Sequence, residues 1–68
     1  MTKYYVNSKK QDNGDNEVHT AECRFLPSSD NRVYLGEFSS CSPAVTAAKD
    51  KGYHANGCIH CCKPCHTS

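Results

Sequence analysis

The sequence has little of what a self-sufficient hydrophobic core requires. Trp is absent, Met occurs once and Phe twice among 68 residues, and hydrophobic residues make up 37% of the chain. A chain of this length buries only about 60% of the surface that its unfolded form exposes. Hydrophobic burial then roughly cancels conformational entropy, so we expect a disulfide or metal staple in addition to the core.

Long apolar runs and an excess charge of one sign are also lacking. No stretch approaches the ~20 apolar residues that a membrane span requires, so we expect no membrane partner. The opening residues, MTKYYVNSKK, lack the apolar run of a secretory signal, and together with Met1 they predict a cytoplasmic protein. With 8 basic and 7 acidic side chains, the net charge of +1 is not the electrostatic footprint of a nucleic-acid-binding domain.

Cysteine and histidine, by contrast, are abundant. The chain has six cysteines and four histidines, and the stretch CIHCCKPCH, residues 58–66, holds four of the cysteines. Clustered cysteines in a reducing cytosol usually indicate a metal, whereas small secreted domains use them as disulfides. We therefore expect a metal staple, with a disulfide framework as the alternative.

The first half of the chain reads as strands joined by polar loops. Residues 3–6 predict a strand, and residues 17–20 return as its hairpin partner after a loop with Asn13-Gly14 as its turn. RVYLGEF, residues 32–38, predicts a third strand. There Val33 and Leu35 should share one face, Tyr34 and Phe38 should share the other, and Gly36 should mark a bulge.

One helix is predicted near residues 42–51. Ser42 suits the N-cap, Pro43 suits the first helical position and Gly52 suits the left-handed position after the last turn. After Tyr53 we expect irregular structure. The sequence therefore predicts one α+β domain over residues 1–68, with about three antiparallel strands and one main helix.

Two local pairs of residues have the spacing of metal ligands. His19 and Cys23 form an H-x-x-x-C pair, and Cys58 and Cys61 form a C-x-x-C pair. Structural zinc takes four such nitrogen and sulfur ligands in a tetrahedron. We expect one Zn²⁺ on these four residues, with backbone N–H groups of the C-x-x-C turn donating to the thiolates.

The cysteine cluster leaves alternatives open. Cys62 and Cys65 also form a C-x-x-C pair, so either is an alternate ligand. A dithiol redox role for this pair is disfavoured, because that chemistry uses a helix after the motif and three residues remain. Cys41 is expected to be a small buried hydrophobe. The other histidines are expected to be surface side chains: His54, His60 and His66.

The order of features resembles a known domain. YYVNSKK, VHTAECRFLP, NRVYLGEFSS, an Ala-rich helix ending in KGY and a cysteine pair near KP follow one another over about residues 4–65. This order resembles the metal-binding domain of Ada-type DNA alkylation-repair proteins and the short stand-alone or nuclease-associated domains similar to it. The resemblance implies a small α+β fold with one zinc, held by residues 19 and 23 and by two ligands after Gly52-Tyr53.

The sequence departs from that family near the last two ligands. Four residues, HANG, precede Cys58 where the family commonly has two, and Cys61-Cys62 doubles a cysteine. These departures leave the register of the last two ligands open.

The resemblance also bears on the reaction. Ada-type domains hold zinc with four thiolates, and the first Cys of a C-x-x-x-C pair accepts a methyl group from a DNA phosphotriester. His19 stands at the matching position and cannot supply a thiolate, so we expect no enzyme activity unless Cys62 or Cys65 replaced it.

The sequence therefore predicts a non-catalytic structural zinc module, monomeric, that interacts with a protein or a nucleic acid. Two alternatives remain. One is a metal-thiolate methyl acceptor in DNA alkylation repair, and the other is a store or sensor of zinc or copper(I) that uses the surplus thiols.

Overall fold

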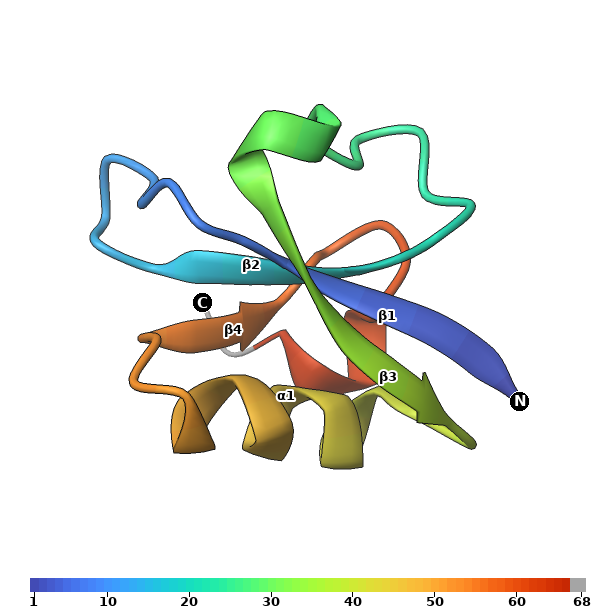
Figure 1. Ribbon diagram of the computed structural model, residues 1–68. Helices are drawn as coiled ribbons and strands as arrows, with labels where there is room; N and C mark the ends of the chain where they lie inside the picture. Colours follow the sequence, from blue (N-terminus) through green and yellow to red (C-terminus); the bar gives the residue numbers. More distant parts are fainter. Residues whose placement is uncertain (67–68) are drawn as a thin grey trace.

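A computed structural model of the chain describes residues 1–66 (Figure 1). Its elements follow the order β1 (Thr2–Asn7), β2 (Asn16–Thr20), η1 (Ser29–Asn31), β3 (Arg32–Phe38), α1 (Cys41–Asp50), β4 (Ala55–Gly57) and η2 (Lys63–Cys65). Within this range the strands form one sheet of order β3-β1-β2-β4, and α1 lies along one of its faces. The predicted α+β class is confirmed, but the sheet has four strands rather than about three.

The sheet is mixed rather than purely antiparallel. β1 is antiparallel to β2 and to β3. In the hairpin, β1 and β2 pair without a register shift, and Tyr5 lies opposite His19. β4 runs parallel to β2, with Val18 opposite Gly57. A parallel pair needs a long crossover, and here the chain between them forms β3 and α1. The β4 sequence, Ala-Asn-Gly, has low strand propensity, which explains why the sequence did not predict it.

A bulge in β3 changes which side chains face the core. Tyr4 pairs with Gly36 but Tyr5 pairs with Tyr34, so Leu35 is the extra residue between them. Gly36 adopts a φ of 123°, which agrees with the predicted bulge. The extra residue reverses the alternation beyond it, so Phe38 packs against the core. The expectation that Phe38 shares a face with Tyr34 is therefore wrong.

The helix begins earlier than the sequence predicted. α1 starts at Cys41 with Ser40 as its extended N-cap residue, so the assignment of Ser42 as N-cap is wrong. Pro43 is the third helical residue rather than the first. Proline is tolerated there because N–H groups in the first turn have no intrahelical partner. The end is as predicted: Gly52 follows the C-cap with a φ of 96°.

The core lies between α1 and the sheet, and one disulfide closes it. Its buried members are Tyr4, Val6, Val18, Cys41, Ala44, Val45, Ala48 and Cys62. Cys41 is buried as expected, but it is also joined to Cys65 by a disulfide that the sequence did not predict. Disulfide connectivity cannot be deduced from cysteine spacing. The bond ties η2 to the first residue of α1.

Among residues 1–66, no helix is long and apolar enough to span a bilayer.

Candidate metal site

The candidate ligands are carried by two segments that leave the sheet at the same end. β2 supplies His19, and the turn after it supplies Cys23, whose N–H donates to the Thr20 carbonyl at 3.2 Å. Cys58 directly follows β4 and donates its N–H to the Val18 carbonyl at 3.0 Å. Because β2 and β4 are parallel, the segments that follow them emerge side by side (Figure 1).

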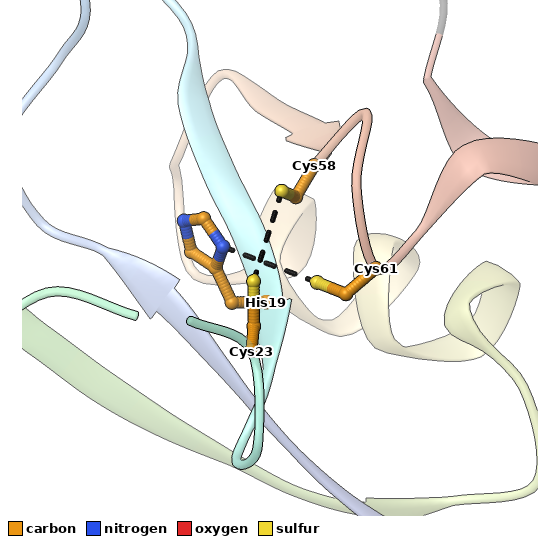
Figure 2. A group of neighbouring side chains, drawn as sticks. All are labelled: His19, Cys23, Cys58 and Cys61. Carbon is orange, nitrogen blue, oxygen red and sulfur yellow. Dashed lines mark hydrogen bonds between the residues drawn. The ribbon is translucent and has the colours of Figure 1, made fainter. Parts of the chain in front are cut away.

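These segments bring four ligand atoms together. His19, Cys23, Cys58 and Cys61 each offer one atom, and the four atoms all lie within 4.8 Å of one another (Figure 2). The Cys23 and Cys58 sulfurs are 4.0 Å apart, and His19 Nδ1 lies 4.0 Å from the Cys61 sulfur. Figure 2 draws these two contacts as dashed lines, one from each residue of the C-x-x-C pair to its partner across the group. Tetrahedral zinc with Zn–S bonds of ~2.3 Å separates its sulfurs by about 3.8 Å, so the group could hold a metal ion.

Backbone N–H groups point at each of the three sulfurs. Phe25 donates to Cys23, His60 donates to Cys58 and Thr20 donates to Cys61, each at 3.4 Å. The donation from His60 agrees with the predicted geometry of the C-x-x-C turn. Such bonds favour the charged form of a thiol, so they would offset part of the repulsion among three thiolates around a metal ion.

The surroundings of His19 favour its neutral form. Its side chain is almost fully buried, and the Glu17 carboxylate lies 3.5 Å from Nε2. Burial lowers the pKa of His19, while the charge of Glu17 opposes this effect in part. A neutral imidazole whose Nε2 faces a carboxylate leaves Nδ1 free to bind a metal. Nδ1 is the nitrogen that faces Cys61.

The alternate ligands are placed elsewhere. Cys62 is fully buried in the core, although its sulfur lies 3.9 Å from that of Cys61. Burial, together with the neighbouring Cys61, raises the pKa of Cys62 to about 12, so this thiol stays protonated near neutral pH. Cys65 is bonded to Cys41. The structure thus brings Cys58 and Cys61, rather than Cys62 or Cys65, to His19 and Cys23.

The remaining histidines lie outside this group of four, as expected. His54 and His60 are exposed, and His66 is half-buried with its Nδ1 3.0 Å from the Gly57 carbonyl oxygen. Sequence reasoning missed the role of Glu17. The signal was available, because residues two apart on a strand share a face and Glu17 precedes His19 by two.

The cluster therefore has the composition and the spacing of a small, partly buried nitrogen–sulfur site. Its four ligand atoms come from β2 and from the segments after β2 and β4, so the fold itself determines which side chains meet. Comparisons of the chain with models of protein families, with curated proteins and with solved structures found no match.

Proposed function

We propose that the chain is a non-catalytic structural zinc module. It holds one Zn²⁺ through His19, Cys23, Cys58 and Cys61, and it presents the surface ordered by that ion to a partner protein or nucleic acid. The observation that carries the proposal is the convergence of four ligand atoms within 4.8 Å. Four protein ligands close the tetrahedron, which is typical of structural zinc, whereas catalytic zinc keeps one position for water or substrate.

The placement of the surplus cysteines supports a non-catalytic role. A methyl acceptor needs a thiolate that the substrate can reach, and His19 stands where the Ada-type acceptor would be. Cys62 is fully buried, and Cys65 is bonded to Cys41. Neither therefore offers a replacement nucleophile. We propose that the likeness to Ada-type domains extends to the arrangement of ligands but not to their reaction.

Native mass spectrometry of the zinc-loaded chain tests the metal assignment. We expect one zinc per chain, lost in Cys23→Ser and kept in His54→Ala, because His54 is exposed and outside the group of four. After cadmium substitution, the ¹¹³Cd shift should report three sulfurs and one nitrogen. A stoichiometry of two metals would instead favour a metal store, and loss of zinc in His54→Ala would contradict the assignment.

A second experiment tests the absence of methyl transfer. The zinc-loaded chain is incubated with methylated DNA, and its intact mass is then measured by mass spectrometry. We expect an unchanged mass, because the buried Cys62 and the disulfide-bonded Cys65 give the substrate no spare thiolate. A mass increase of one methyl group, mapped to any cysteine by peptide analysis, would overturn the non-catalytic assignment.

A further inference from the structure

The tips of the two cysteine-bearing turns meet outside the metal site. The Phe25 ring stacks on the His60 imidazole, with centroids 4.2 Å apart and planes 25° from parallel. Phe25 donates its backbone N–H to the Cys23 sulfur, and His60 donates its own to the Cys58 sulfur. The sulfurs that would bind the metal therefore also position the stacked pair.

This stacked pair belongs to an exposed patch. Phe25 is 51% exposed and Ile59, the residue before His60, is 48% exposed, which makes them two of the most exposed large apolar side chains in residues 1–66. The Arg24 guanidinium lies 5.9 Å from the centroid of the Phe25 ring. We call Arg24, Phe25, Ile59 and His60 the platform. A single exposed apolar residue needs no explanation, but here two segments far apart in sequence meet to form one surface.

Charge narrows the kind of ligand that the platform fits. Residues 23–29 and 57–66 contain Arg24 and Lys63 but no Asp or Glu. The nearest carboxylate in sequence, Glu22, lines a separate hollow with Lys3 and Glu37. The platform thus offers a flat ring, a guanidinium and positive charge without carboxylates. A ligand with a planar π face and a negative charge complements it.

We propose that the platform binds single-stranded nucleic acid. One unpaired base stacks on the face of the Phe25 ring that His60 does not cover, and Arg24 contacts the adjacent phosphate. Stacking of this kind tolerates any base, because every base has a π face. A duplex hides those faces, and the net charge of +1 gives it few phosphate contacts. This inference rests on the proposed function, because the metal ligands order the platform.

Fluorescence anisotropy at low salt tests the proposal with the zinc-loaded full chain. The probes are labelled oligo-dT and oligo-U of about ten nucleotides, a labelled duplex and an acidic Tyr-containing peptide. We expect the single strands to bind best and Phe25→Ala to weaken them about 5- to 150-fold, the range for loss of one stacked base. Tyr34→Ala is the matched control, since Tyr34 is also an aromatic residue and is 48% exposed on β3, outside the platform.

A second variant guards against a folding defect in Phe25→Ala. The chain has no Trp, so Phe25→Trp introduces a single Trp, which can be excited selectively over the tyrosines, at the platform and keeps a ring for stacking. We expect this variant to bind the single strand as the parent does, with its emission quenched by the bases. Unquenched emission at saturating oligonucleotide would contradict stacking at Phe25.

The outcomes separate this inference from the proposed function. One zinc per chain without single-strand binding overturns the platform alone, whereas a chain that binds no zinc overturns both. Preference for the duplex or for the acidic peptide, or equal losses in Phe25→Ala and Tyr34→Ala, would also overturn it. Loss of binding in Phe25→Ala with zinc retained supports it.

Discussion

The Glu17 carboxylate lies 3.5 Å from Nε2 of His19, on the ring edge away from Cys61. Both residues belong to β2, and their spacing of two places them on the same face of the strand. An acceptor on Nε2 fixes the ring orientation and the tautomer, and it makes Nδ1 a stronger base toward a metal. Glu17 is therefore a positioning residue for the proposed site.

Glu17→Ala should weaken zinc binding. Loss of such an outer partner typically costs about 10- to 100-fold in metal affinity. A competition titration against a chromophoric chelator measures the effect. Glu37→Ala is the control, because Glu37 is an exposed carboxylate on β3 away from His19. Equal affinities for the two variants would show that the carboxylate does not act through His19.

Removal of the metal should unfold much of the chain. Apparent binding energies for structural zinc are about 10–16 kcal/mol. The whole stability of a typical domain is about 5–15 kcal/mol, and this core is small. Addition of a strong chelator should therefore abolish the chemical-shift dispersion of the amide NMR signals, and addition of excess zinc should restore this dispersion. A spectrum that stays dispersed after the metal has left would show that the core and the disulfide suffice.

Zinc affinity should fall as the pH is lowered. Burial holds the pKa of His19 below its ordinary 6.5, so the folded chain takes up this proton at a lower pH than the unfolded chain. The stability contributed by neutral His19 is present above pH 6.5 and is lost as the pH falls through the lower folded-state value. Burial also raises the pKa of Cys23, so zinc must displace its proton.

A series of competition titrations from pH 8 to about pH 5.5 measures this dependence. Because three thiols and one imidazole must lose protons, we expect a loss of at least about tenfold per pH unit. An affinity that stays constant across this range would contradict a site made of His19 and three thiolates.

The disulfide should stabilise the zinc-loaded chain further. Cys41 and Cys65 are 24 residues apart in sequence. Chain entropy predicts a contribution of about 3.5 kcal/mol for a closed loop of this size. Denaturant titration of the zinc-loaded protein, oxidised and reduced, measures it. Cys41→Ser is the control, since reduction should leave its unfolding midpoint unchanged. A midpoint that reduction also leaves unchanged in the parent chain would show that the bond adds no stability.

Much of the fold could be predicted because local signals were strong. The strand at residues 32–38 coincides with β3, and the hairpin and Gly52 agree with the structure. The misses have physical causes. β4 has no strand propensity of its own and is held by its parallel pairing to β2. The start of α1 shifted because two serines, Ser40 and Ser42, each suit an N-cap and sequence alone does not rank them.

The candidate site could be predicted for a different reason. Ligand spacing is a local property, so His19, Cys23, Cys58 and Cys61 could be put forward before the fold was known, with Cys62 and Cys65 left open as alternates. The functions of the other cysteines could not, because they depend on packing between distant segments. Cys62 lies in the core rather than in the site, and Cys41 is joined to Cys65. Neither the burial of Cys62 nor the pairing of Cys41 with Cys65 can be predicted from a local sequence pattern.

Because β2 and β4 pair in parallel, the four metal ligands can meet only after the crossover between these strands has formed. Half of the ligands are present once the first hairpin forms, but the other half arrive only when the chain has passed through β3 and α1. A metal held by all four residues therefore reports that the crossover is complete. Since non-local contacts of this kind are costly to close, zinc should bind the folded chain far more tightly than a chain in which only the first hairpin has formed. Molecules that have not completed the crossover would then lose their zinc to a chelator more readily than folded molecules do.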